Sequence, residues 1–169
     1  MALVSASTLR EYLPEISDNT EVDADLNSLI ERVENGIAYY LGFPQLDSLL
    51  SPTLESNTYT LYVNSPTIRD PYTLQLPIIA VSSITSVHSD DDRSYGTGTL
   101  IDASTYELDK SLGRIRLIPD KVTRSFSHGY RSNKVVCVAG YTSGTVPGSL
   151  VHSICVYAAH LHRNKNNPG

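Results

Sequence analysis

Apolar residues recur at steps of three and four along residues 23–41, and this spacing predicts an amphipathic helix. Asp23 is expected to cap its N-terminus, because a carboxylate there can accept the free N–H groups of the first turn. Gly42 is the expected stop, and Pro44 prevents the helix from resuming nearby. The predicted buried stripe consists of Leu26, Leu29, Ile30, Val33, Ile37, Tyr40 and Leu41.

The same spacing returns near the C-terminus, where Pro147 suits the first helical position because its missing N–H would have no partner there. A shorter helix is expected near the N-terminus, with Thr8 and Glu11 as a capping box and Pro14 after its end. Leu9, Tyr12 and Leu13 form its apolar stripe. The stripe predicted for the C-terminal helix consists of Leu150, Val151, Ile154, Tyr157, Ala158 and Leu161.

Between these helices the pattern changes to short runs rich in β-branched and aromatic residues, each bounded by Pro, Gly, Asp, Asn or Ser. Residues 135–139 are apolar on both faces and are expected to form the most buried strand. The predicted strands span residues 58–63, 73–76, 80–88, 105–108, 113–118 and 134–139. The order of elements predicts an α+β fold in which terminal helices pack together around a β-rich antiparallel sheet or sandwich.

The length of 169 residues fits one domain. We expect residues 1–169 to form that domain, with helical parts at 7–50 and 147–165 and a β-rich insertion at 55–142. Residues 163–169 are polar, contain helix breakers and are expected to be a disordered tail. No apolar run is long enough to cross a membrane, and the N-terminal residues do not resemble a secretion signal.

Charge is distributed unevenly along the chain. Residues 1–60 carry ten acidic and two basic residues, a net −8, whereas residues 61–169 carry eight and eleven, a net +3. Copies of the chain could therefore meet with opposite charges facing, although two solvated faces explain the pattern equally well. Eleven tyrosines, against two phenylalanines and no tryptophan, suit surfaces that become half-buried on assembly. Glu31 and Glu34 are expected on the solvated outer face of the helix over residues 23–41.

Chemistry-bearing motifs are sparse, and we expect no enzymatic activity, no metal and no cofactor. His152, His160 and His162 lack the spacing that aims two imidazoles at one ion. The acidic run 90–92 after His88 does not match a calcium loop and indicates an exposed hairpin turn. No serine-hydrolase elbow, dinucleotide loop or phosphate loop occurs. Cys137 and Cys155 lie in apolar patterns and are expected to be reduced core thiols.

Residues 110–134 form a basic segment interleaved with Phe126 and Tyr130, a combination that can bind a nucleic-acid strand. The chain as a whole is acidic, with a sequence pI of about 5.4, which favours a contact with the acidic helices of a neighbouring copy instead. The candidates for this contact between subunits are Glu31, Glu34, Arg114, Arg116, Lys121, Arg124 and Arg131.

Three segments in sequence order resemble the head–tail connector (adaptor) family of tailed bacteriophages, over nearly the full length of the chain. The first is the opening helical pair, TLREYL followed by DADLNSLIERVENGIAYYLGFP. The second is a proline-led strand, an acidic turn, a Tyr-Glu-Leu-Asp strand and a Gly-Arg-Ile strand within residues 76–119. The third is VVCVAGYTSGTVPGSL, an apolar strand and a Gly-Tyr turn that lead into the final helix. The β segment at 55–142 is longer than compact helical members of the family carry.

The resemblance implies a structural virion protein that forms a ring, typically of twelve copies, at the virion neck between head and tail. Such a ring joins the portal protein to a tail-side stopper or tail-completion protein and continues the channel through which DNA passes without specific binding. Assembly in the host cytoplasm is expected. The acid-rich N-terminal helices could face the channel, where repulsion keeps the duplex from sticking.

The C-terminal residues match the part of the family that contacts the portal, and residues 160–169 could order only on docking. These portal-contact candidates are His160, His162, Arg163, Asn164 and Lys165. Two alternatives stay open. One is a head-closure or tail-completion component, and the other is a small module that binds nucleic acid or carbohydrate.

Overall fold

The computed structural model describes residues 2–46, 51–64 and 70–165, which are arranged in two compact units. The helical unit comprises Met1–Glu55 with Tyr141–Gly169, and the β unit comprises Ser56–Gly140. The fold is α+β with antiparallel sheets, as predicted. That residues 1–169 behave as one connector domain stays a prediction. None of the described helices is both long and apolar enough to cross a membrane.

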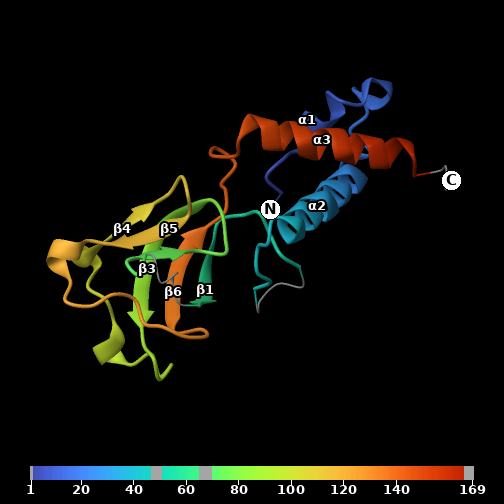
Figure 1. The fold of residues 1–169 in the computed structure, drawn as a ribbon. Coiled ribbons are helices and arrows are strands. Elements are labelled where there is room, and N and C mark those ends of the chain that lie inside the picture. The colour runs from blue at the N-terminus through green and yellow to red at the C-terminus, as the bar shows by residue number, and fades with distance from the viewer. Residues whose placement is uncertain (1, 47–50, 65–69, 166–169) are drawn as a thin grey trace. The chain divides into compact units, whose positions relative to one another are not determined.

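In the helical unit, α1 (Ala6–Arg10), α2 (Asp23–Tyr40) and α3 (Gly148–Arg163) pack against one another (Figure 1). The predicted capping box is wrong, because the Ser5 hydroxyl caps α1 by accepting from the Thr8 N–H at 3.2 Å. Asp23 is the first residue of α2 rather than its cap, and the cap position is held by Val22. Pro147 precedes the first turn of α3 as the capping residue.

The predicted end of α2 at Gly42 is confirmed, and hydrogen bonds from the next residues close the helix. Gly42 has a φ of 79° and donates its N–H to the Tyr39 carbonyl at 3.1 Å. Phe43 donates its N–H to the Ala38 carbonyl at 3.0 Å, and the Phe43 side chain is buried. This pair of bonds satisfies the last carbonyls of α2 and requires a left-handed residue, which glycine supplies without a Cβ clash.

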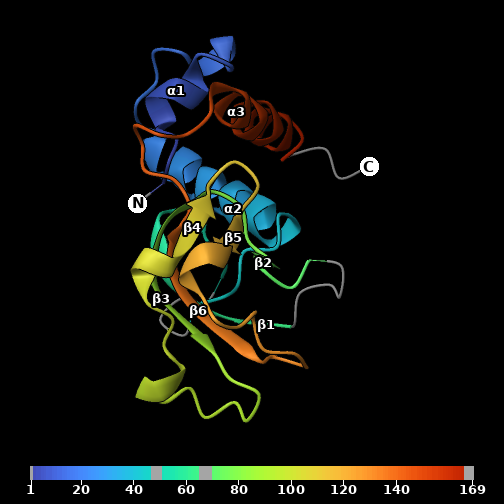
Figure 2. The ribbon, with the colours of Figure 1, turned by 60° about the vertical axis from the view of Figure 1, so that its left-hand side comes forward.

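All six predicted strands are present in the β unit (Figure 2). One sheet has the order β1–β6–β3 and the other β2–β5–β4, with every pair antiparallel. The strand that was predicted to be the most buried, β6, has no exposed residue and is the central strand of its sheet. The strands are β1 (Asn57–Val63), β2 (Thr73–Gln75), β3 (Val81–Ser89), β4 (Tyr106–Asp109), β5 (Arg114–Leu117) and β6 (Asn133–Ala139).

The segment between β5 and β6 links the two sheets. The Phe126 N–H donates to the Pro71 carbonyl beside β2 at 3.2 Å, and the Ser127 N–H donates to the Ser89 hydroxyl of β3. The Phe126 ring is completely buried. Tyr59 and Phe126 are the largest fully buried side chains of this unit, and strands of both sheets also contribute buried residues.

Short 3-10 helices span Pro14–Ile16, Thr97–Thr99, Ala103–Thr105 and Pro119–Lys121.

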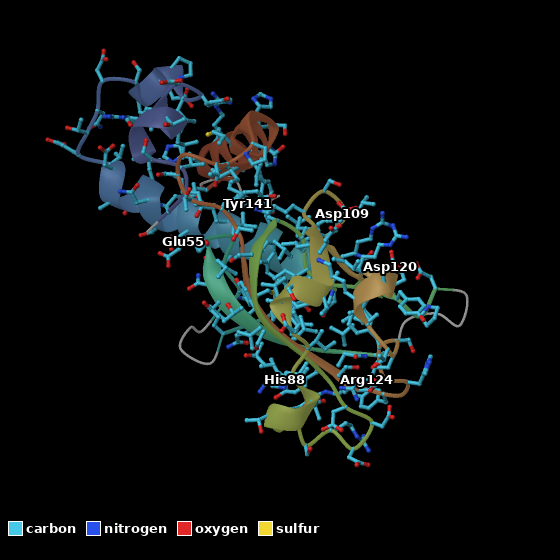
Figure 3. The ribbon with its side chains drawn as sticks, turned by 90° about the vertical axis from the view of Figure 1, so that its left-hand side faces the viewer. Glu55, His88, Asp109, Asp120, Arg124 and Tyr141 are labelled. Carbon is cyan, nitrogen blue, oxygen red and sulfur yellow. The ribbon has the colours of Figure 1, made fainter. Side chains whose placement is uncertain are left out.

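The chain enters and leaves the β unit at one place. Glu55 and Tyr141 form an isolated parallel bridge, and both are marked in Figure 3. The Tyr141 N–H donates to the Leu54 carbonyl at 2.8 Å, and Leu54 is buried. The two connecting segments are therefore hydrogen-bonded to each other where they meet the helical unit.

Candidate assembly interface

The helical unit exposes aromatic and aliphatic side chains that its helices do not cover. On α3 the buried face consists of Ile154, Cys155, Ala158 and Ala159. Tyr157 is 51% exposed and Leu161 36% exposed, so their predicted place in the buried stripe is wrong. The apolar stripe of α3 is wider than the area that α1 and α2 cover, and its outer edge meets solvent. An exposed aromatic and aliphatic edge of this kind is typical of a surface that becomes buried on assembly.

The end of α2 shows the same departure from the predicted pattern. Tyr40 was expected in the buried stripe but is 88% exposed, and the neighbouring Tyr39 is also exposed. The buried face of α2 instead includes Val33, Glu34 and Ala38. Tyrosine tolerates both water and a partner surface, so the two rings at this helix end are candidate contact residues. The tyrosine excess in the composition was the signal for such positions, but it could not say which tyrosines they are.

Glu34 is buried, which corrects its predicted place on a solvated face, whereas Glu31 is exposed as predicted. The Glu34 carboxylate accepts the main-chain N–H of Leu3 at 3.2 Å and that of Val4 at 3.0 Å. Burial raises the pKa of Glu34, the two N–H bonds oppose that rise, and the charge of Glu55 adds to it. Glu34 therefore anchors the N-terminal segment.

A groove of about 920 Å³ lies beside this carboxylate. Its walls include Leu3, Asn27, Glu31, Asn35 and Glu55. The polar groups among its described lining residues are hydroxyls, amides and carboxylates, and none of these lining residues is a lysine or an arginine.

The C-terminal end of α3 carries the predicted portal-contact residues. The helix continues through His160 and His162 to Arg163, and Asn164 follows as its cap. The Arg163 Nε donates to Glu15 Oε1 at 2.9 Å, and its Nη2 donates to the Tyr12 carbonyl at 2.9 Å. The bond from Arg163 lowers the pKa of Glu15.

Lys165 lies 3.5 Å from Asp25, and the Asn164 amide bonds back to His160. The predicted disordered tail at 163–169 thus begins with a helical residue, and residues 166–169 lie outside the described residues. That residues 160–169 order only on docking stays a prediction for the part beyond α3. His160 and Arg163 already have helical positions in the protomer.

The basic segment of the β unit is divided between internal pairs and exposed cations. Arg114 bonds to Asp109 at 3.1 Å, and Lys121 donates to the Ser104 carbonyl at 3.2 Å. Arg116 and Arg124 are exposed. Bonds to Asp109 from the Ser111 hydroxyl, the Leu112 N–H and Arg114 lower the pKa of Asp109.

The nucleic-acid alternative relied on aromatic rings interleaved with these bases. Phe126 lies in the core, so that ring cannot stack on a base. Tyr130 is exposed. Of the two rings, only Tyr130 could stack on a base, and the chain as a whole is acidic. These observations favour the hypothesis that the basic segment contacts another protein chain over the hypothesis that it binds a nucleic-acid strand.

In the acidic turn after His88, which is labelled in Figure 3, Asp91 and Asp92 are exposed as predicted, whereas Asp90 is not. Asp90 is buried and accepts the N–H groups of Asp92, Ser94 and Tyr95 together with the Ser94 hydroxyl. These bonds, led by that of Ser94, lower the pKa of Asp90. The carboxylate therefore organises the loop instead of offering free oxygens to a ligand.

Within the described ranges, no three His, Cys, Asp or Glu side chains gather where they could hold a metal ion. His152 shares a hydrogen bond of 3.1 Å with the Tyr12 hydroxyl. Cys137 and Cys155 are buried free thiols, and burial raises the pKa of each to about 11. A buried thiol with this pKa is a poor nucleophile at neutral pH.

Comparisons with solved structures identify the same architecture in particle necks. The chain is similar to one in the neck of a native gene transfer agent particle with twelvefold symmetry, with 16% identity, a TM-score of 0.56, and coverage of 100% of this chain and 85% of the other. A second match is to the neck of the empty particle with sixfold symmetry, at 18% identity, TM-score 0.57, and 95% and 78% coverage.

A third match is to the virion of the native particle, at 18% identity, TM-score 0.53, and 87% and 70% coverage. No protein-family model and no curated protein matches the sequence. At these identities the likeness shows a shared fold. This chain therefore has the fold of chains found in the symmetric neck of a gene transfer agent particle.

Proposed function

We propose that this protein is a structural component of the neck of a tailed, phage-like particle, where identical copies form a ring. The observation that carries the proposal is the likeness to a twelvefold-symmetric neck, which extends over 100% of the chain and so includes both units. A shared fold does not by itself establish a function, but the exposed side chains of the helical unit also support assembly with other protein chains. Exposed Tyr39, Tyr40, Tyr157 and Leu161 are suited to contacts between protein chains.

We further propose that the ring joins the portal protein to a tail-side protein and continues the DNA channel. The charge of the helical unit supports a channel role, because the unit contains ten acidic and only four basic residues, a net charge of −6. Acidic side chains along a channel repel the DNA backbone and let the duplex move. The β unit, with eight acidic and nine basic residues, has a net +1, and the two values sum to the −5 of the whole chain.

The end of α3 is our candidate for the portal contact. His160 and Leu161 face solvent there, while Arg163 holds the helix end to the rest of the unit through Glu15. A helix end fixed in this way can present its outer residues to a partner without first losing its own contacts. Arg114, Arg116, Lys121 and Arg124 on the β unit, with Glu31 on α2, stay candidates for contacts between subunits.

Negative-stain microscopy of the purified chain, alone and mixed with the portal protein of the same particle, tests the proposal. We expect rings, or an added layer under the portal, with a copy number of about twelve by analogy with the neck symmetry. Attachment to the tail instead of the portal would support the head-closure or tail-completion alternative. A chain that stays monomeric with both partners would contradict the proposed function.

A truncation locates the portal contact. Removing residues 164–169 leaves Arg163 and its bonds to Glu15 and Tyr12 in place, so the helical unit should fold as before. We expect this variant to form rings but lose portal attachment. Unchanged attachment would show that residues 164–169, Asn164 and Lys165 among them, are not needed for the portal contact, and would leave His160, His162 and Arg163 as its candidates.

A further inference from the structure

Four side chains form a cluster at the end of the β1–β6–β3 sheet that is marked by His88 in Figure 3. We name it the tyrosine–arginine cluster: Tyr62, Tyr95, Arg131 and Lys134. The Tyr62 and Tyr95 rings are 5.6 Å apart and inclined at 49°. The Arg131 guanidinium lies 4.4 Å from the centre of the Tyr62 ring, and the Lys134 ammonium lies 5.8 Å from the centre of the Tyr95 ring. Cations over aromatic faces at these distances are attracted to them.

The backbone holds the cluster in a fixed arrangement. The Arg131 N–H donates to Asn64 Oδ1 at 2.9 Å, and the Tyr95 hydroxyl donates to the Arg131 carbonyl. The buried Asp90 carboxylate accepts the Tyr95 N–H at 2.8 Å. The loop that carries Tyr95 and the loop that carries Arg131 are therefore hydrogen-bonded to each other, and the Arg131 backbone is also bonded to Asn64, which follows β1.

Backbone strain concentrates at the same place. Among the described non-glycine residues with a left-handed φ, Arg93 (60°), Tyr95 (51°) and Arg131 (53°) belong to these two loops, and Ala80 (56°) is the fourth. Such conformations cost about 1 kcal/mol or more each and persist where the surrounding structure enforces them. Three of the four described positions of this kind therefore lie in the two loops that carry the cluster.

The cations of the cluster lack acidic partners. Arg163, Lys165 and Arg114 each pair with a carboxylate, whereas no described carboxylate lies within ion-pair distance of Arg131 or Lys134. Stacking on Tyr62 uses one face of the guanidinium and leaves its N–H edge able to take a carboxylate. Arginine and tyrosine are also among the residues most enriched in the binding centres of protein interfaces.

We propose that the tyrosine–arginine cluster binds carboxylates on the helical unit of a second copy of this chain, an inference that rests on the proposed ring. A ring made by head-to-tail contacts needs two different, complementary surfaces on each copy. The helical unit carries a net −6 and exposes four acids without an ion pair among the described residues. These acids are Glu11, Asp18, Glu21 and Glu31.

DNA is the weaker partner for this surface. Exposed Asp91 and Asp92 belong to the same loop as Arg93, and together with Asp90 they balance the charges of Arg93, Arg131 and Lys134. A neutral, mixed-charge tip gains little from a phosphate backbone, whose binding depends on net positive charge. A carboxylate on a protein surface needs only one well-placed guanidinium.

Charge reversal tests the contact in the full-length chain. We expect Arg131→Glu to raise the protein concentration at half-assembly by about tenfold or more, measured by mass photometry alone and on the portal protein. Lys110→Glu makes the same charge change on an exposed residue outside the cluster and should leave assembly unchanged. Reversing the matching acid, with Glu11→Arg, Asp18→Arg, Glu21→Arg or Glu31→Arg in the Arg131→Glu background, should restore assembly in one combination.

The outcomes separate the two proposals. Rings of Arg131→Glu as stable as those of the unchanged chain would overturn the cluster contact and leave the ring proposal intact. An unchanged chain that never forms rings, alone or on the portal, would overturn both. Weakened rings that no acid reversal restores would overturn the carboxylate partner. Salt-sensitive binding of a short duplex that Arg131→Glu abolishes, with assembly unchanged, would assign the cluster to DNA instead.

Folding is checked separately, since Arg131 has a strained backbone. The neutral Arg131→Gln and Lys134→Gln variants keep long polar side chains and should weaken assembly in the same direction by a smaller factor. Their thermal unfolding midpoints should match that of the unchanged chain. Assembly lost only in variants with a lowered midpoint would contradict a direct contact.

Discussion

Glu34 accepts a hydrogen bond from the main-chain N–H of Val4 at 3.0 Å, although the two residues are 30 positions apart in sequence. The second carboxylate oxygen accepts the N–H of Leu3. One buried acid thus satisfies two backbone donors that precede α1, and Val4 itself is buried. The start of the chain is held to α2 by this side chain as well as by apolar contact.

We expect Glu34→Ala to lower the free energy of unfolding by about 1–3 kcal/mol, because two donors in a buried setting lose their acceptor. Glu31→Ala, on the exposed side of the same helix, should change it by no more than about 0.5 kcal/mol. Denaturant unfolding measures both. Amide exchange of Leu3 and Val4 should accelerate in Glu34→Ala alone, and equal exchange in the two variants would contradict the anchoring role.

Glu34 should also give stability a distinctive pH dependence. Burial raises its pKa in the folded state, so the folded protein binds this proton at a higher pH than the unfolded chain does. The contribution is fully present below the ordinary glutamate pKa and is lost as pH rises through the raised value. The stability difference between the unchanged chain and Glu34→Gln should therefore fall across that window, and NMR titration should show a higher pKa for Glu34 than for exposed glutamates.

Gly113 should resist substitution. It has a φ of 59°, and a Cβ there would lie 3.1 Å from the Ile78 carbonyl oxygen. We expect Gly113→Ala to destabilise the β unit by about 1–2 kcal/mol, because alanine pays a steric cost in the left-handed region. Gly98→Ala is the matched control, since nothing lies within 4 Å of its added Cβ. Equal unfolding midpoints for the two variants would show that the turn adapts.

The two faces of α3 should respond differently to substitution. Ile154 is completely buried, and Ile154→Ala should cost about 2–5 kcal/mol of stability. Tyr157 is half exposed, and Tyr157→Ser should leave the isolated chain near its original stability but weaken assembly. Thermal unfolding and mass photometry on the same samples separate the effects. Unaltered assembly of Tyr157→Ser would remove this face from the list of contact surfaces.

The two thiols should be inert in the folded protein. Cys137 and Cys155 are completely buried and their pKa values are raised to about 11, so little reactive thiolate exists at pH 8. We expect a thiol reagent to label neither cysteine in native buffer and both in denaturant. Rapid native labelling of Cys155 would show that α3 detaches from its unit.

Local patterns in the sequence determined much of the secondary structure. The stop at Gly42 and the six strands follow from backbone preferences and from the alternation of apolar residues, which act within a few residues of the chain. The α+β class followed from their order. The resemblance to neck connectors arose from the same ordered segments, and the fold agrees with solved neck structures.

Tertiary structure decided which side of each element is covered. The helical pattern predicts Glu34 on the solvated face of α2, but the approach of Leu3 and Val4 makes this an interior position. Tyr157 and Leu161 continue the apolar stripe of α3, yet both side chains are exposed, because the packed face of α3 is the one that carries Ile154 and Ala158. The cluster of Tyr62, Tyr95 and Arg131 joins three separate segments through sheet register and loop hydrogen bonds. Burial and long-range pairing depend on residues distant in sequence, so a pattern read along one helix or strand cannot contain them.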